Sequence, residues 1–304
     1  MDFNITILGS NSAIPAHGRN QTSQLISWDG ESLLIDCGES TQQQLRKYKI
    51  KYSKISHIFI SHLHGDHCLG LMGLINTYHL NNRKLPLHIY GPKGLDYIIT
   101  IQLKYSASIL NFPLIFHLTI PQGKIKLAEI RDLVIYSFPL QHRIPCTGFS
   151  FEEKNPRIHL NKEMMAKHLP EVAAIHILQK GRDVKDNSGN VLLKSSEFCE
   201  ITPPRKYSYC SDTAFDLDLV PFIKGADLLY HESTFMEAEK KRAKLTKHST
   251  AKEAALIAKA ANVKNLLLGH YSSRYVKLDL LLNEARETFE PSLLSEEGTT
   301  YTIK

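Results

Sequence analysis

Hydrophobic and polar residues alternate in short runs near both ends of the chain, and this period of two predicts β-strands. Such runs lie near residues 3–8, 23–28 and 32–36, with a closing run over residues 299–303. Elsewhere apolar residues recur at a spacing of three and four, which predicts amphipathic helices. These predicted helices cover residues 41–49, 71–80, 94–103, 251–261 and 278–289. The alternation of strands and helices indicates an α/β protein.

One predicted strand, residues 55–60, runs directly into Ser61-His-Leu-His-Gly-Asp-His67. Imidazole and carboxylate ligands suit Zn²⁺ and neighbouring first-row ions, and the absence of a thiolate cluster favours a catalytic site. His62 and His64 project to the same side of an extended segment. Asp66 and His67 follow Gly65, whose freedom allows the chain to turn them toward a second position. The motif therefore predicts two metal ions rather than one.

Two ions need more ligands than this motif supplies, because each ion takes about four protein or water partners. Three polar residues stand just beyond other strand-like runs: His142, Asp212 and His270. The edge of a sheet presents ligands at such positions. Any one of the three alone is more typical of a capping or structural residue. Together with the motif, they become candidate ligands.

At this point the chain resembles the metallo-β-lactamase fold and, within it, the ribonuclease Z family of tRNA 3′-processing endoribonucleases. The resemblance extends in order from Gly9 to about Arg274. Besides the histidine motif, it rests on Leu34-Ile-Asp-Cys-Gly-Glu39 with Thr41-Gln42, Gly70-Leu-Met-Gly-Leu74, Ile89-Tyr-Gly-Pro-Lys-Gly94, and His231-Glu-Ser-Thr-Phe235 with His248-Ser-Thr250. The generic fold shares little beyond the metal ligands, so the Gly-Pro-Lys-Gly and His-Ser-Thr segments point to the nuclease branch. The resemblance implies a four-layer αββα sandwich with the metal site at one rim.

The resemblance also implies roles for individual residues. One metal takes His62, His64 and His142, the other takes Asp66, His67 and His270, and Asp212 bridges them. The implied cofactor is two Zn²⁺ ions per chain, with Mn²⁺ or another divalent ion as the alternative. Such a pair lies about 3.5–4 Å apart, lowers the pKa of a bridging water and stabilises an in-line phosphoryl displacement.

Asp66 would also accept the proton of that water, and His248 would protonate the leaving oxygen with Glu232 orienting its imidazole. A general acid is chemically sensible there, because the departing ribose 3′-oxygen is a poor leaving group. The alternative for His248 is a residue that merely precedes a helix cap formed by Ser249 or Thr250 with Glu253.

Composition is consistent with a single large domain. With 304 residues and 42% hydrophobic content, the chain can bury a large core, and ligands spread from position 62 to 270 favour one domain over residues 1–304. No apolar run is as long as a membrane span, and the N-terminus lacks the features of a signal peptide, so a cytoplasmic protein is expected. The five cysteines, without paired spacing, are expected to be free thiols.

Residues 152–206 are the least regular part of the sequence, because several prolines and glycines interrupt them. They are expected to form an insertion that corresponds to the tRNA-binding arm of bacterial family members. The arm's Gly-Pro motif is missing; its nearest counterpart here is His176-Ile-Leu-Gln-Lys-Gly181. Two other departures from the family pattern are His17, near the position of the family's usual lysine, and Ser211, where glycine normally precedes the aspartate.

The net charge of +6 mildly favours a polyanionic partner. The run Lys240-Lys-Arg-Ala-Lys244 with Lys247 lies just before His248, where it could hold a phosphate backbone or simply form a solvated helix face. The function expected from the resemblance is removal of 3′ trailers from tRNA precursors, by a homodimer. The alternatives are a phosphodiesterase or sulfatase acting on small molecules on the same two-metal scaffold, and a nucleic-acid-binding relative without catalysis.

Overall fold

The structure is a computed structural model in which residues 2–304 are described. The chain divides into two compact units. The first comprises residues 1–129, 134–151 and 206–304, and the second comprises residues 130–133 and 152–205. The second unit therefore has nearly the bounds of the segment that the sequence marks as an insertion.

The first unit contains two sheets of seven strands each. The N-terminal sheet has the order β18-β1-β2-β3-β4-β5-β6. Its strands are β1 Phe3–Gly9, β2 Ser23–Trp28, β3 Glu31–Ile35, β4 Ile55–Phe59, β5 Leu87–Gly91, β6 Leu114–Leu118 and β18 Thr300–Thr302. Strands β3 to β6 run parallel to one another. Their carboxyl ends therefore meet at the same edge of the sheet.

The C-terminal sheet has the order β17-β16-β15-β14-β9-β8-β7. Its strands are β7 Ile125–Ile130, β8 Leu133–Leu140, β9 Cys146–Glu153, β14 Lys206–Cys210, β15 Leu228–Glu232, β16 Asn265–Gly269 and β17 Ser292–Leu294. Strands β14 to β17 are also parallel. Here too, the loops that follow the strands gather at one edge.

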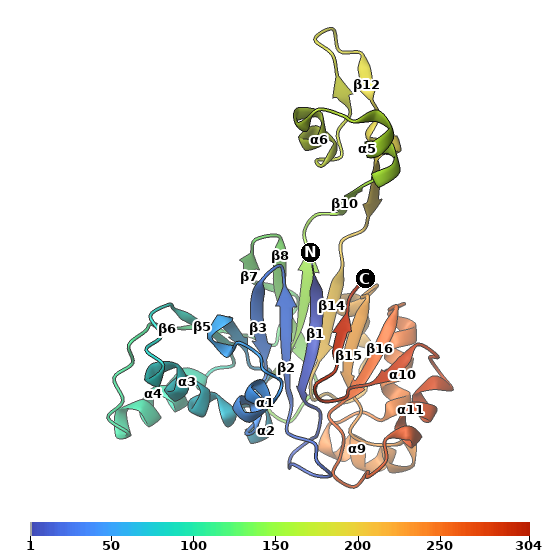
Figure 1. Ribbon diagram of the computed structural model, residues 1–304. Helices are drawn as coiled ribbons and strands as arrows, with labels where there is room; N and C mark the ends of the chain where they lie inside the picture. The colour runs from blue at the N-terminus through green and yellow to red at the C-terminus, as the bar shows by residue number, and fades with distance from the viewer. Residues whose placement is uncertain (1) are drawn as a thin grey trace. The chain divides into compact units, whose positions relative to one another are not determined.

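Helices cover the outer face of each sheet (Figure 1). On the N-terminal sheet they are α1 Thr41–Lys47, α2 Gly65–Cys68, α3 Gly70–Leu80 and α4 Leu95–Tyr105. The helices of the C-terminal half are α8 Val220–Ile223, α9 Lys240–Thr246, α10 Ala251–Ala260 and α11 Asp279–Arg286. All five helices predicted from the sequence are thus present, as α1, α3, α4, α10 and α11, with bounds that differ by a few residues.

Each sheet has its own hydrophobic core against its helices. One core joins β3 and β4 to α1, α3 and α4 through residues such as Leu34, Leu45 and Ile99. The other joins β14 to β16 with α10 and α11. Between the sheets, the ring of Phe59 lies 5.5 Å from that of Phe149. The first unit is therefore a helix–sheet–sheet–helix sandwich, and the prediction of an α/β protein with four αββα layers is confirmed.

The second unit is more regular than its sequence indicates. It contains β10 Arg157–Leu160, α5 Lys162–His168, α6 Val172–Leu178, β11 Val184–Lys185, β12 Val191–Leu193, α7 Ser195–Phe198 and β13 Cys199–Thr202. Buried Leu178, Val184 and Phe198 form a small core of its own. Near the two ends of residues 152–205, Arg205 Nη2 donates to Glu153 Oε1 at 2.6 Å, and both side chains are buried. Helices of one or two turns have too few apolar positions to show a period, which is why the sequence pattern missed them.

The described residues contain no helix with both the length and the apolar character that crossing a membrane requires.

Three histidines lie side by side across β4, β5 and β6. The rings of His57 and His88 stack at 4.7 Å, and His88 Nδ1 lies 3.0 Å from His117 Nε2. Burial, together with His88 and His117, lowers the pKa of His57 from 6.5 to about 4. The folded chain therefore keeps His57 neutral at a pH at which the unfolded chain protonates it.

Unfolding should consequently become easier as the pH falls from about 6.5 to 4, because only the unfolded state gains the proton. The variant His57→Phe keeps a flat ring that does not titrate. When the pH is lowered from 7.5 to 5, we expect its free energy of unfolding to fall by about 1 kcal/mol less than that of the unmodified chain, after allowance for solvent screening. Urea unfolding at the two pH values measures this difference. Equal losses in both chains would contradict the assignment of the effect to His57.

Candidate active site

The candidate ligands lie in the loops that follow strands of the two sheets. His62 and His64 follow β4, and Asp66 and His67 lie in the short helix α2. The remaining three come from the C-terminal half: His142 after β8, Asp212 after β14 and His270 after β16. The structure brings all seven together, and Asp66 and His270, which are in contact, are 204 residues apart in the sequence.

A first group contains His62, His64, His142 and Asp212, whose ligand atoms lie within 4.8 Å of one another. His64 Nδ1 is 2.9 Å from His62 Nε2 and 3.2 Å from His142 Nε2. Asp212 Oδ2 is 3.5 Å from His62 Nε2 and 3.7 Å from His142 Nε2. Three nitrogens and one oxygen thus face a common point.

A second group contains Asp66, His67 and His270. The Nε2 atoms of the two histidines are 3.2 Å apart, and Asp66 Oδ2 is 3.5 Å from His67 and 3.3 Å from His270. Asp212 joins this group through its other oxygen, since Oδ1 is 3.3 Å from His67 Nε2 and 3.1 Å from His270 Nε2. One carboxylate therefore presents one oxygen to each group.

These distances fit divalent metal ions. Tetrahedral bonds of 2.0–2.1 Å place neighbouring ligand atoms about 3.3 Å apart, close to the nitrogen separations found in both groups. Asp212 Oδ1 is buried and has no hydrogen-bond partner among the described residues, although two imidazole nitrogens lie beside it. A cation between these atoms would satisfy all of them at once.

The electrostatics of the two groups also favour a cation. Burial raises the pKa of Asp212, but the imidazoles around it, led by His270, outweigh this effect and hold the pKa well below its usual range. Burial lowers the pKa of His62 and that of His142, so both rings stay neutral and keep a lone pair for a metal. At His67 burial is outweighed by nearby carboxylates, led by Asp212, which raise the pKa well above its usual value. The carboxylates that favour a proton on His67 would equally favour a metal ion at this position.

The ring nitrogens that face away from the two groups are held by acceptors, as in metal sites where outer partners orient the ligands. The partners are Ser61 Oγ for His62 at 3.0 Å, Asp36 Oδ2 for His67 at 2.8 Å, the Lys247 carbonyl for His142 at 2.9 Å and Thr234 Oγ1 for His270 at 2.9 Å. None of these four was predicted from the sequence to hold a ligand. Asp36 and Thr234 lie in segments that carry the family resemblance, and Ser61 adjoins a predicted ligand, but the sequence assigned none of them this role, and nothing in it marks the Lys247 carbonyl.

His248 lies beside the first and second groups of candidate ligands, which are called the metal-ligand groups below. Its Nδ1 is 2.8 Å from Glu232 Oε1 and 4.0 Å from Asp212 Oδ2. Glu232 is fully buried and also accepts from the Thr213 and Thr234 backbone N–H groups at 3.1 and 3.0 Å. Burial alone would lower the pKa of His248, but Glu232 outweighs it and raises the pKa to about 9.

The helix cap considered for this segment is also present. Thr250 caps α10 and forms a capping box with Glu253. The cap uses Thr250 and leaves the His248 side chain directed to Glu232. The two interpretations of the segment are therefore compatible.

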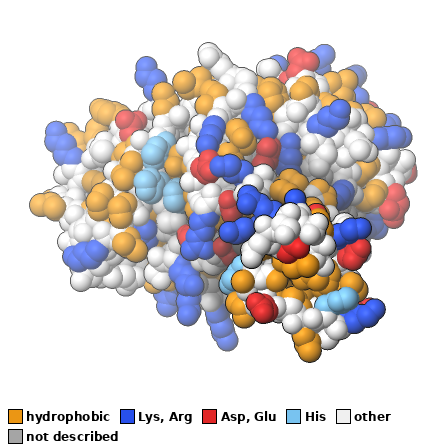
Figure 2. Space-filling model, turned by 90° about the horizontal axis from the view of Figure 1, so that it is seen from above, with side chains coloured by type: hydrophobic (Ala, Val, Ile, Leu, Met, Phe, Trp, Pro, Cys, Tyr) orange, Lys and Arg blue, Asp and Glu red, His pale blue; other side chains and the backbone are white. Residues whose placement is uncertain are grey.

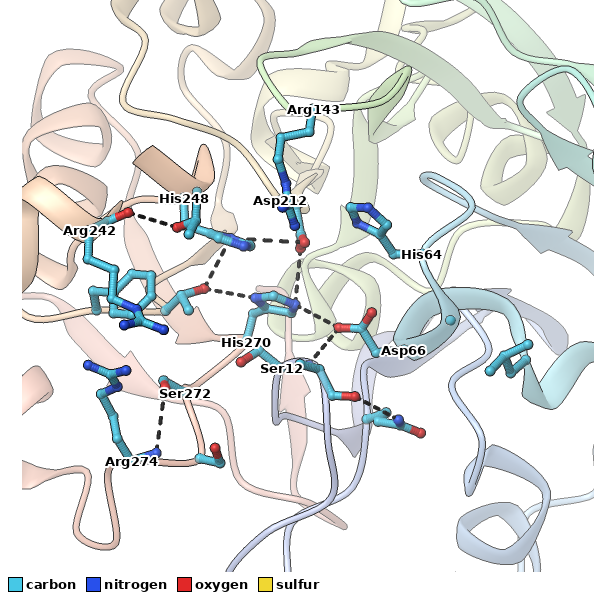
Figure 3. A pocket seen from close by; sticks show the side chains of 18 residues that line it. Ser12, His64, Asp66, Arg143, Asp212, Arg242, His248, His270, Ser272 and Arg274 are labelled. Carbon is cyan, nitrogen blue, oxygen red and sulfur yellow. Dashed lines mark hydrogen bonds and ion pairs between the residues drawn. The ribbon is translucent and has the colours of Figure 1, made fainter. Parts of the chain in front are cut away.

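A cavity of about 620 Å³ opens over these residues. Figure 3 shows Arg242 and Arg274 on one side, His64 and Asp66 on the other, and Asp212 and His270 between them. The Arg274 guanidinium lies 5.4 Å from the centre of the Phe235 ring and pairs with Glu239 at 2.9 Å. Because Glu239 offsets the charge of Arg274, the net positive charge on this side of the cavity comes from Arg242, and Phe235 adds an aromatic ring to the same lining.

Comparisons with known proteins agree with this geometry. The family described as Anti-Pycsar protein Apyc1 matches residues 3–154. A ribonuclease Z of Cytophaga hutchinsonii is 46% identical over 304 residues, covering 100% of this chain and 97% of the relative. The crystal structure of human tRNase Z, short form, superposes with a TM-score of 0.74 at 29% identity, over 99% of both chains. The metallo-β-lactamase fold protein YhfI from Bacillus subtilis superposes with a TM-score of 0.70 at 19% identity, covering 99% of this chain and 100% of that one, and shows the fold alone. The resemblance seen in the sequence is confirmed, and the chain belongs to the ribonuclease Z family.

Proposed function

We propose that this protein is a metal-dependent endoribonuclease that removes 3′ trailers from tRNA precursors, leaving a 3′-hydroxyl on the tRNA and a 5′-phosphate on the trailer. The observation that carries the proposal is the pair of His/Asp groups joined by Asp212, with His248 beside them, in a chain of the ribonuclease Z family. The alternative of a hydrolase acting on small molecules is not favoured, because ribonuclease Z relatives match this chain over nearly its full length.

We assign one Zn²⁺ ion to His62, His64 and His142 and a second to Asp66, His67 and His270, with Asp212 shared and Mn²⁺ or another divalent ion as the alternative. Bound there, the ions would supply an activated water and charge stabilisation for the phosphoryl oxygens. Asp66 Oδ2 accepts the Ala13 backbone N–H at 2.7 Å, which orients that carboxylate within the second group, where it would accept a proton from the activated water.

His248 is proposed as the proton donor to the departing ribose 3′-oxygen. Glu232 holds its Nδ1, so Nε2 is the nitrogen available for the substrate. A histidine whose pKa is raised by a buried carboxylate carries a proton at neutral pH, which is the form that a general acid needs.

The cavity's positive side fits an RNA backbone. Lys240, Lys244 and Lys247 line a further hollow of about 350 Å³ next to His248. Lys240 pairs with Glu237 at 3.0 Å, so we assign phosphate contacts to Lys244 and Arg242 instead. On the face shown in Figure 2, by contrast, Lys and Arg side chains are scattered among hydrophobic and acidic ones.

The second unit is proposed to contact the tRNA away from the metal ligands, which all lie in the first unit. That the protein is a homodimer and is cytoplasmic also remains a proposal. The direct test of the function is incubation of the metal-loaded protein with an end-labelled tRNA precursor, followed by mapping of the cut. Cleavage that releases the 3′ trailer and leaves a 3′-hydroxyl on the tRNA is expected. Intact precursor, with efficient turnover of a cyclic or simple phosphodiester, would rule the assignment out.

A variant with a shortened second unit tests whether that unit serves tRNA binding rather than the hydrolysis itself. Strands β10 and β13 are antiparallel with Ile158 opposite Ile201, so an Asn-Gly turn can replace residues 159–200 and join these two positions. We expect this deletion to weaken precursor binding about tenfold or more and to reduce its salt dependence, because the slope falls by about one unit for every phosphate that the protein no longer neutralises. Hydrolysis of a small chromogenic phosphodiester should stay nearly unchanged. Filter binding at several salt concentrations gives the slope, and unchanged precursor affinity would exclude the second unit from tRNA recognition.

A further inference from the structure

Each of two buried carboxylates contacts two residues of the active site, one directly and one through a hydroxyl group. Asp36 Oδ2 accepts from His67 Nδ1 at 2.8 Å, and it also accepts from Ser61 Oγ at 2.9 Å. Ser61 Oγ in turn lies 3.0 Å from His62 Nδ1. Asp36 thus reaches an imidazole in each metal-ligand group. All four side chains are fully buried.

The same arrangement recurs around Glu232. Its Oε1 is 2.8 Å from His248 Nδ1, and its Oε2 accepts from Thr234 Oγ1 at 2.7 Å. Thr234 Oγ1 lies 2.9 Å from His270 Nδ1. Glu232 thus reaches both the proposed proton donor and a proposed metal ligand. Thr234 is only 4% exposed, so water does not compete for these bonds.

The number of protons on each group decides which atom donates in these hydrogen bonds. A neutral histidine that binds a metal through Nε2 carries its proton on Nδ1 and must donate it. His62 therefore donates to Ser61, and His270 donates to Thr234. Each hydroxyl has a single proton, which goes to the carboxylate, the strongest acceptor in reach. Ser61 Oγ also lies 3.0 Å from Ser211 Oγ, but Asp36 competes for the single Ser61 proton as the stronger, charged acceptor.

We propose that Ser61 and Thr234 are positioning residues that transmit the charge of Asp36 and Glu232 to His62 and His270, and so strengthen metal binding in both groups. This inference rests on the ligand roles proposed above. If the Ser61 hydroxyl is removed, the buried Nδ1–H of His62 loses its hydrogen-bond acceptor. Removal of the Thr234 hydroxyl does the same to the Nδ1–H of His270. The histidine would then hold its ring orientation and its basicity less well.

The test measures zinc affinity rather than cleavage. Protein stripped of metal is titrated with zinc in competition with a chromophoric chelator. We expect Ser61→Ala and Thr234→Val to weaken zinc binding about 10–100-fold, the usual range for loss of an outer partner of a ligand. Thr234→Ser keeps the hydroxyl and should bind zinc nearly as tightly as the unmodified chain.

Two matched variants control for the loss of a buried hydroxyl as such. Ser208→Ala and Thr119→Val also remove buried hydroxyls, and neither hydroxyl has a hydrogen-bond partner among the described residues. Zinc affinity should be unchanged in both. Thermal unfolding of the metal-free chains checks folding, and Thr234→Ala replaces Thr234→Val should the latter not fold.

Unchanged zinc affinity in Ser61→Ala and Thr234→Val would overturn the proposal, as would equal losses in Thr234→Ser and Thr234→Val. A failure of the underlying ligand assignment would look different, because the unmodified chain would then bind no zinc. The measurement needs no RNA, so its outcome is independent of the substrate assigned to the protein.

Discussion

Replacing Asp212 with Asn is expected to abolish tRNA-precursor cleavage, with a loss of at least about 10³-fold. The reason is that Asp212 presents Oδ2 to one metal-ligand group and Oδ1 to the other. An amide has no charge and only one oxygen, so it cannot serve both. Loss of several kcal/mol of charge stabilisation corresponds to this factor at 1.36 kcal/mol per tenfold. Metal content should fall together with activity, which elemental analysis of the purified variant would show.

The matched control is Asp227→Asn. Asp227 is also a buried aspartate beside the C-terminal sheet, directly before β15, but it accepts from the Lys206 backbone N–H and pairs with Lys264, outside both metal-ligand groups. That variant should keep its metal and its activity. An Asp212→Asn protein with two tightly bound ions per chain would refute the bridging role.

His248→Ala is expected to lose about 10²–10⁴-fold in cleavage, the range for a missing general acid, while keeping fold and metal. Its imidazole lies 2.8 Å from a fully buried Glu232, and 4.0 Å from Asp212. However, Asp212, His248 and His270 also form a group able to hold a metal. Metal content therefore decides between the two roles of His248.

Single-turnover cleavage and metal analysis of two histidine variants make this decision. His142→Ala removes an assigned ligand and should lose metal, whereas His248→Ala should retain it. Glu232→Gln should reduce cleavage less than His248→Ala, since it weakens the orientation of the imidazole without removing it. If His248→Ala loses as much metal as His142→Ala, then His248 is a ligand and the proton donor must be sought elsewhere.

The sequence by itself predicted the chemistry of the site. The motif from His62 to His67 concentrates three imidazoles and a carboxylate in six residues, and the strand-end positions of His142, Asp212 and His270 could be predicted from local apolar runs. Periodicity within a strand or helix is a local property, so it predicted most elements of the sandwich. The resemblance to ribonuclease Z then indicated the order of the layers, and the comparisons confirmed the family.

Only the tertiary structure decided how the ligands are held. Tyr209 donates to Asp36 across 173 residues of sequence, and Thr234 contacts His270 across 36. No local pattern encodes such contacts, because they depend on where two sheets place the ends of their strands. The second unit shows the same limit at a smaller scale: its helices of seven residues or fewer are too short for a hydrophobic period, and they are stabilised by the small core around Leu178 that forms only when the segment folds.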